Sequence, residues 1–161
     1  MLKTVAGARN IGTGERRRAR TSDEGTLMST THTDAVSRVG EFYDLLAQGR
    51  GDDVAAFVEA NFAEDAVLRR PESLPGGGAL VGAARIAKMM RAAAAGVTGL
   101  NLRVAHGAEA ADGVHVFAEI ALELAGTSTT ALEWWTFSGS KVASMQAYYW
   151  DTAAILAAAT R

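Results

Sequence analysis

The sequence predicts a single α+β domain in which a cone-shaped, curved mixed sheet wraps around three N-terminal helices. Helical periodicity is confined to the first half of the chain, whereas strand-like alternation fills four consecutive runs in the second half. Helices that precede a series of hairpins favour an α+β fold over a parallel, doubly wound sheet. The chain has 161 residues, 48% of them apolar, which is enough for one domain with its own core. From this topology we expect the sheet to curl round the helices and enclose a cone-shaped cavity.

Three helices are predicted before the run of hairpins. Apolar residues recur at helical spacing over about Asp34–Gln48, which defines the first helix. The second helix covers about Asp52–Asn61 and carries Phe57 on its apolar stripe. The third covers about Ala83–Ala95 and directs Met89 inward. The apolar stripes of these helices are expected to face the sheet.

Five strand-like runs are separated by residues that favour turns. They are about Ala66–Arg70, Leu100–Ala108, Val114–Leu124, Thr129–Phe137 and Val142–Trp150. After the first run, Pro71 stops regular pairing, and a loop follows at Glu72–Gly78 (ESLPGGG). A final short helix is expected over about Thr152–Ala159.

Alternation along the strands predicts which side chains face the helices. One face of Val114–Leu124 is aliphatic and includes Ile120, so this face should look toward the helices. The same argument places His106 inward, near the end of its strand. The last strand carries large aromatic residues on both faces, which fits helices inside and a second subunit outside. We therefore expect a homodimer through the outer sheet face, with exposed apolar candidates Trp134, Tyr148 and Trp150.

Glu133 is the most informative residue, because its strand places it on the same face as Trp135 and Phe137. A carboxylate among large aromatic residues is costly unless it is paired, hydrogen-bonded or protonated. Two alternatives are open for Glu133. It is either a raised-pKa acid held for chemistry, or a structural carboxylate tied to Arg70 or to a backbone amide.

Composition and charge exclude several classes of function. The net charge of −2 gives no reason to expect nucleic acid as a partner, and no apolar run reaches the length of a membrane span. The chain has no cysteine, which is compatible with the cytoplasmic location that we expect. Three scattered histidines predict no metal site, and the Gly-rich loop lacks the lysine of a phosphate cradle. No cofactor is expected.

The N-terminal segment differs in charge from the rest of the chain. Residues 1–27 carry six Lys/Arg against three Asp/Glu, and the basic run Glu15–Arg20 has no apolar periodicity around it. We expect residues 1–31 to be a disordered or artefactual basic extension and residues 32–161 to form the single domain. A nucleic-acid or targeting tail is the alternative for this segment.

Several local strings, in this order and spacing, resemble the nuclear transport factor 2-like superfamily, which includes SnoaL-like polyketide cyclases and ketosteroid isomerases. They are FYDLLAQGRGD at 42–52, FAEDAV at 62–67, Pro71 before the glycine loop, GAARI at 82–86, and EWWTFSGSKVASMQAYY at 133–149. The resemblance covers about residues 35–152. It implies a cystatin-like α+β barrel with an apolar pocket, often dimeric. Function varies widely within this superfamily, so the fold does not define it.

The resemblance also implies roles for particular residues. Glu133 falls where ketosteroid isomerases keep a protonated Asp that donates to an oxyanion, and part of the final strand falls on the pocket wall. However, Arg70 replaces the general base that precedes the proline, and Phe42 replaces the oxyanion tyrosine, with Tyr43 one residue away. These departures argue against steroid isomerisation by that mechanism.

Two functions are therefore predicted as alternatives. The first is a cofactor-independent proton-transfer enzyme (an isomerase, cyclase or dehydratase) acting on a small apolar carbonyl or polycyclic substrate. Its expected catalytic residues are Glu133, His106 and Tyr43. The second is a non-catalytic ligand-binding or dimerisation module of the same fold. In either case the residues expected to contact the small apolar molecule are Arg70, Phe42, Phe57, Met89, Ile120, Trp135, Met145 and Tyr149.

Overall fold

The computed structural model describes residues 20–124 and 126–159. Its helices are α1 (Arg20–Ala47), α2 (Gly51–Asn61), α3 (Ala83–Ala94) and α4 (Thr152–Ala159). Its strands are β1 (Phe62–Arg70), β2 (Gly78–Val81), β3 (Thr98–Ala110), β4 (Gly113–Leu124), β5 (Thr127–Ser138) and β6 (Lys141–Tyr149). All four predicted helices and all five predicted strands are present, although α1 and β1 begin earlier in the chain than predicted.

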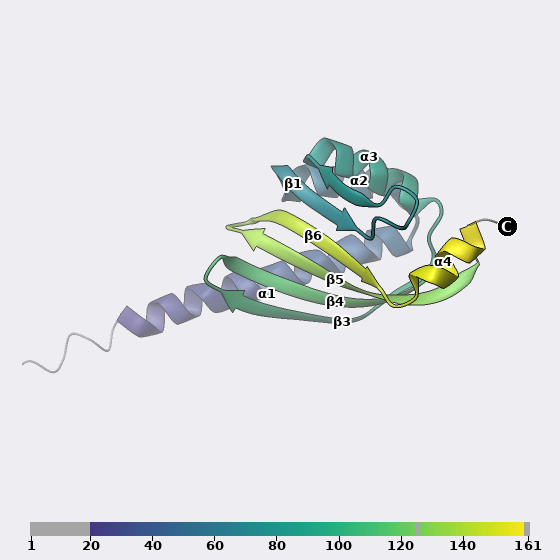
Figure 1. The fold of residues 1–161 in the computed structure, drawn as a ribbon. Coiled ribbons are helices and arrows are strands. Elements are labelled where there is room, and N and C mark those ends of the chain that lie inside the picture. Colours follow the sequence, from purple (N-terminus) through teal and green to yellow (C-terminus); the bar gives the residue numbers. More distant parts are fainter. Residues whose placement is uncertain (1–19, 125, 160–161) are drawn as a thin grey trace, which may run out of the picture.

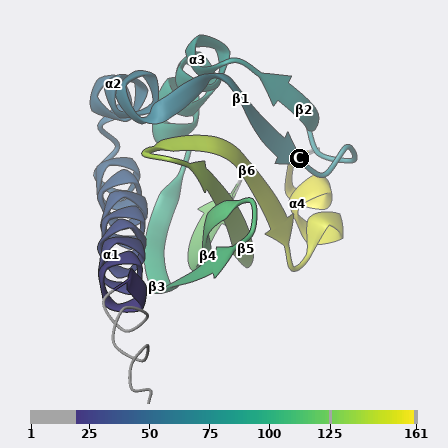
Figure 2. The same cartoon turned by 90° about the vertical axis from the view of Figure 1, so that its left-hand side faces the viewer.

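The strands form one mixed sheet in the order β2-β1-β6-β5-β4-β3. Strands β1 and β6 run parallel, and every other neighbouring pair is antiparallel. The sheet curves around the helices, with α1 running beside β3 and with α2 and α3 lying across one end (Figures 1 and 2). This arrangement confirms the predicted α+β class. The sheet is nevertheless not closed, because β2 and β3 remain its two edges.

Two elements differ most from the sequence prediction. Helix α1 begins at Arg20 instead of about Asp34, so its backbone enters the segment predicted to be a disordered extension. The remainder of that predicted extension, residues 1–19, lies outside the described residues. Strand β2 was not predicted, because its four residues carry no useful alternation and it forms through pairing with β1.

The core lies between the concave face of the sheet and the helices. Helix α1 packs against β3 and β4, and α3 packs against β1 and α2. The predicted inward face of β4 is confirmed, since Val116, Ala118 and Ile120 are all buried. From α1, Val39 and Phe42 are fully buried against this face. The amphipathic patterns therefore placed the core correctly along β4 and α1.

His106 does not point inward, and a β-bulge explains why. Leu102 pairs with Ile120 on the concave face, but the register shifts immediately afterwards and Val104 pairs with Glu119. One extra residue in β3 moves every later side chain to the opposite face of the sheet. His106 is consequently exposed on the outer face. The prediction that it lies inside the cavity, close to Glu133, was wrong.

The outer face of the sheet carries a group of exposed apolar side chains. Trp134 is 37% exposed, Tyr148 44% and Trp150 88%, as the strand alternation predicted. His115 lies on the same face but is buried, with its ring packed against that of Trp134. Trp134 Nε1 donates to its Nδ1 at 2.9 Å, and Asp112 lies 3.0 Å from its Nε2. An indole N–H can only donate, so the His115 proton resides on Nε2, toward Asp112.

Among the described helices, none is long and apolar enough to cross a membrane.

Gly77 ends the loop that follows β1, and it sits where no side chain fits. A Cβ at this position would lie 2.0 Å from the Pro71 carbonyl oxygen and 2.8 Å from that of Leu74. Both are backbone atoms of the same tight loop, in which Leu74 N–H donates to Pro71 O and Gly77 N–H donates to Leu74 O. The loop can therefore close in this way only with glycine at position 77.

We expect Gly77→Ala to lower the free energy of unfolding by about 1–3 kcal/mol, because the loop backbone must shift to admit the methyl group. Urea denaturation measures this difference. Gly40→Ala is the matched control. Gly40 lies within α1 and its added Cβ would meet no atom within 4 Å, so this variant should gain about 0.5–1 kcal/mol. Equal stability of the two variants would contradict the argument.

Candidate functional site

Glu133 lies in the middle of β5 with its carboxylate on the concave face of the sheet. Its cross-strand neighbours are Ala118 on β4 and Ala147 on β6, both buried. Because these neighbours carry a single methyl group each, the sheet leaves space around the carboxylate. Glu133 itself is only 6% exposed. The sequence therefore correctly placed a buried acidic group on the inner face.

The carboxylate is held by a short chain of hydrogen bonds from α1 and β5. The Tyr43 hydroxyl donates to Glu133 Oε2, and Trp135 Nε1 donates to the Tyr43 oxygen at 3.2 Å. Both donors are almost completely buried. The described residues provide no salt bridge to Glu133, so the alternative in which this carboxylate is tied to Arg70 or to a backbone amide is not what the structure shows.

Burial raises the pKa of Glu133 from 4.5 to about 7. Removal from water is the largest cause, since it disfavours the charged form. The hydrogen bond from Tyr43 and the positive charge of Arg70 act in the opposite direction and lower this pKa. Near neutral pH the side chain is therefore present both as a carboxylate and as a carboxylic acid, which is the condition for a group that accepts and returns a proton.

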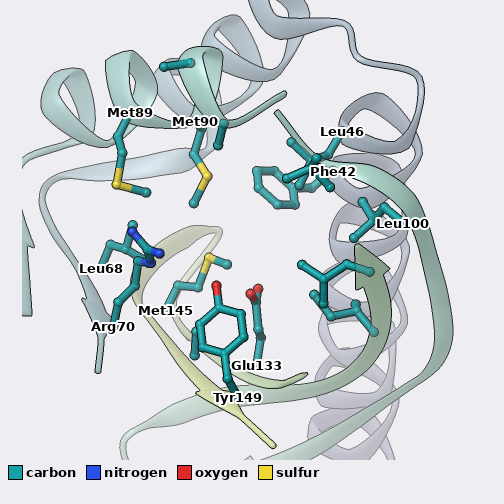
Figure 3. A pocket seen from close by; sticks show the side chains of 16 residues that line it. Phe42, Leu46, Leu68, Arg70, Met89, Met90, Leu100, Glu133, Met145 and Tyr149 are labelled. Atoms are coloured by element: carbon teal, nitrogen blue, oxygen red, sulfur yellow. The ribbon is translucent and has the colours of Figure 1, made fainter. Parts of the chain in front are cut away.

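A cavity of about 350 Å³ opens over Glu133, between the sheet and helix α3. Figure 3 shows the Glu133 carboxylate and the Tyr149 hydroxyl pointing into it, with Met89 and Met90 of α3 across from them. The sixteen lining residues are mostly apolar, and Glu133, Arg70 and Tyr149 supply its polar groups. Such a site suits a small, largely apolar ligand with a few polar atoms.

Six of the eight residues predicted to contact the ligand do line this cavity: Phe42, Arg70, Met89, Ile120, Met145 and Tyr149. The other two, Phe57 and Trp135, belong to an aromatic cluster behind it. Their rings pack edge-on or tilted against Phe42, at 5.8 Å and 5.0 Å between centroids. All three residues belong to the packed core, and Phe42 is the one that also lines the cavity.

Tyr43 also lies behind the cavity wall and not in it. The sequence left open that its hydroxyl donates to a ligand oxygen, but that hydroxyl is already bonded to Glu133. Tyr43 is therefore a positioning residue, which acts on a ligand through Glu133. Burial, together with the charge of Glu133, raises the pKa of Tyr43 well above its ordinary value, so this phenol stays protonated and remains a donor.

Sequence reasoning missed part of the cavity wall, on the helices and on the strands. The residues not predicted are Leu46, Leu68, Met90, Ala92, Ala93, Val97, Leu100 and Leu122. Helical periodicity had assigned Met90 to the inward face but could not separate core positions from cavity positions.

Among the described residues, no group of three or more His, Asp or Glu side chains is arranged to hold a metal ion.

Tyr43→Phe is expected to raise the pKa of Glu133 further above about 7, because the hydrogen bond that it removes stabilises the carboxylate. Carboxyl titration followed by carbon NMR of labelled glutamate measures this shift. Tyr148→Phe is the matched control, since Tyr148 lies on β6 but is exposed on the outer face. An unchanged or lowered Glu133 pKa in Tyr43→Phe would show that the hydrogen bond does not govern this titration.

The fold and the site together define a class of protein: a cone-shaped α+β domain with an apolar cavity and one buried carboxyl group. The sequence profile of the SnoaL-like domain matches residues 39–145. This chain belongs to the SnoaL-like domain family. The match covers the end of α1, all of α2 and α3, strands β1 to β5 and the first half of β6, and it includes Glu133.

Solved structures share the nuclear transport factor 2-like fold at low sequence identity. A steroid delta-isomerase from Pseudomonas aeruginosa is 14% identical with a TM-score of 0.61, covering 79% of this chain and 87% of that one. A nuclear transport factor 2-like protein with a cystatin-like fold from Novosphingobium aromaticivorans is 17% identical with a TM-score of 0.59, covering 90% and 98%.

A de novo designed protein with a curved β-sheet is 16% identical with a TM-score of 0.60, covering 80% of this chain and 93% of that one. No curated protein sequence matches this chain significantly. These likenesses establish the fold, and they include both an isomerase and a designed protein. The function of this chain therefore has to be argued from its own site.

Proposed function

We propose that this protein is a cofactor-independent proton-transfer enzyme that acts on a small apolar carbonyl compound, with Glu133 as its acid–base group. The observation that carries the proposal is a buried carboxyl group with a pKa of about 7 that faces an apolar cavity and has no ion-pair partner among the described residues. A group that titrates near working pH is best suited to both steps of a proton transfer.

The proposed chemistry is a proton shift next to a carbonyl group. Glu133 as carboxylate removes a proton from the carbon beside the carbonyl, and the electrons of the C–H bond form an enolate. The resulting carboxylic acid returns the proton to another position of the same ligand, which regenerates the carboxylate. Tyr149 lines the same cavity, and its hydroxyl would donate to the enolate oxygen and stabilise the negative charge there. His106 has no part in this scheme, because it lies on the outer face.

Deuterium exchange tests the proposal without knowledge of the natural substrate. The probe is 2-tetralone, an apolar bicyclic ketone with acidic protons beside its carbonyl. In D₂O, NMR follows the loss of these protons with and without the protein. We expect acceleration that requires Glu133. If the probe binds but exchanges no faster than in buffer, the enzyme proposal fails, and the alternative of a non-catalytic ligand-binding module of the same fold is favoured.

We further propose that two copies of the chain associate through the outer sheet face. The exposed side chains of Leu132, Trp134 and Tyr148 lie next to one another on β5 and β6, and such a patch favours burial against a second copy. Leu132→Lys is expected to convert the dimer into a monomer in sedimentation velocity. The wild-type chain sedimenting as a monomer at micromolar concentration would contradict this proposal.

A further inference from the structure

Arg70 is a cation whose charge no carboxylate of the described residues neutralises. It is the last residue of β1, half-buried, and it lines the cavity. Its recorded hydrogen bond goes to the Pro75 carbonyl oxygen at 3.4 Å, and it also interacts with the Tyr149 hydroxyl. Both of these partners are neutral. The guanidinium therefore brings a positive charge to a mostly apolar cavity.

The two ionisable groups of the cavity do not neutralise each other. No oxygen of Glu133 lies within 4 Å of Arg70, although the positive charge acts on this carboxyl at longer range. Tyr149 is the third polar group, and burial raises the pKa of its phenol, which keeps it a hydrogen-bond donor. In Figure 3, Arg70 extends from β1 toward the side of the cavity where Tyr149 rises from β6.

A partly desolvated cation in an apolar cavity is stabilised by an anion that enters with the ligand. A guanidinium presents several N–H donors in one plane and matches a carboxylate in particular. The cavity of about 350 Å³ corresponds to roughly a dozen water-sized groups at about 30 Å³ each, which suits a body of two fused rings or a comparable aliphatic skeleton. Met89 and Met90 provide an adaptable apolar wall for it.

We infer that the ligand of this cavity is an apolar organic acid, whose carboxylate binds Arg70 while its apolar body extends past the α3 methionines toward Glu133, with its carbonyl oxygen beside the Tyr149 hydroxyl. The inference rests on the proposed function in that it names the substrate class of the same site. It makes Arg70 the residue that selects acids over neutral compounds of the same shape. The reactive carbonyl carbon would then lie within the ligand body, beside Glu133.

Binding of an acid should depend on the ionisation of Glu133. The groups that face Glu133 are Tyr43 from α1, Tyr149 from β6 and Arg70 from β1. Helix α3 and strands β3 and β4 present only apolar residues to the cavity. As pH rises through about 7, Glu133 gains a negative charge close to the ligand carboxylate, so affinity for the acid should fall and affinity for a neutral analogue should not.

The test compares 2-naphthoate with 2-naphthamide, which has the same shape but no charge. At about pH 6 the naphthoate carboxyl group, with a pKa near 4, is ionised. Isothermal titration calorimetry on the full chain should show the acid binding about tenfold or more tightly than the amide. Arg70→Met should abolish this preference. Arg69→Met is the matched control, because Arg69 is the neighbouring but exposed residue, and it should preserve the preference.

Equal affinity of the wild-type chain for the two compounds overturns the inference, as does a preference that survives Arg70→Met. Failure of 2-naphthoate to bind at about 1 mM also overturns it. Arg70→Lys keeps the charge and should retain part of the preference if Arg70→Met does not fold. The inference and the proposed function fail separately. An acid preference that depends on Arg70, without Glu133-dependent deuterium exchange, leaves an acid-binding module, whereas exchange without an acid preference leaves an enzyme for neutral ketones.

Discussion

Glu133→Gln is expected to slow deuterium exchange into bound 2-tetralone by about 10²–10⁴-fold, the range that one well-placed acid–base group contributes. Glutamine keeps the size of the side chain and can still accept the hydrogen bond from Tyr43, but it cannot take a proton from the ligand. Affinity for the probe should change little, because the apolar lining of the cavity is intact. NMR exchange rates at saturating protein concentration separate the two effects.

Glu119→Gln is the matched control for this prediction. Glu119 lies on the neighbouring strand β4, but its side chain is on the outer face and pairs with Arg103 at 3.4 Å. This variant should exchange protons at the wild-type rate. The wild-type rate should also rise with pH through about 7 as Glu133 becomes ionised. A Glu133→Gln protein that folds, binds 2-tetralone and exchanges at the wild-type rate would remove Glu133 from the mechanism.

The second large effect concerns stability as a function of pH. The pKa of Glu133 is about 7 in the folded chain and near 4.5 when the side chain is in water. Between these values the folded state binds more protons than the unfolded state, so its stability falls as pH rises. Well above pH 7, at about pH 8 and beyond, Glu133 is buried and almost fully ionised, and the accumulated loss of stability is about 3 kcal/mol.

Glu133→Gln should abolish this loss, because glutamine does not titrate. Between about pH 4.5 and about pH 8, the free energy of unfolding of the wild type should therefore fall by about 3 kcal/mol more than that of the variant. Urea denaturation series at the two pH values measure the difference. Glu119→Gln should follow the wild-type curve, since Glu119 is exposed on the outer face, away from the cavity. If the stability of wild type and Glu133→Gln changes equally with pH, the prediction that burial raises the pKa of Glu133 is contradicted.

Local patterns predicted the elements well, because periodicity reflects which residues are buried. The alternation in β4 and β5 correctly placed Ile120 and Glu133 on the concave face. The same alternation failed in β3, where the bulge after Leu102 reverses the faces and turns His106 outward. A bulge depends on pairing with β4 and leaves no mark on the hydrophobic pattern of β3 itself.

The candidate site was likewise predicted in part from local patterns and decided in part by tertiary contacts. The unusual placement of a carboxylate beside Trp135 identified Glu133 from the sequence. Its hydrogen-bond partner Tyr43 lies 90 residues earlier, on α1, and the contact exists only because that helix packs against the sheet. Phe57 and Trp135 are apolar and inward, as predicted, but whether an inward residue fills the core or lines a cavity depends on how the helices cross the sheet.

The sequence by itself determined the order of helices and strands, the α+β class and the presence of one acidic side chain on a buried face. These follow from local periodicity and from the cost of burying charge. The tertiary structure alone decided that Tyr43 orients Glu133, that Arg70 reaches the same cavity without a carboxylate partner in the described part of the chain, and that His106 lies outside. Those features depend on strand register and on helix packing, which join residues distant in the chain and have no local pattern.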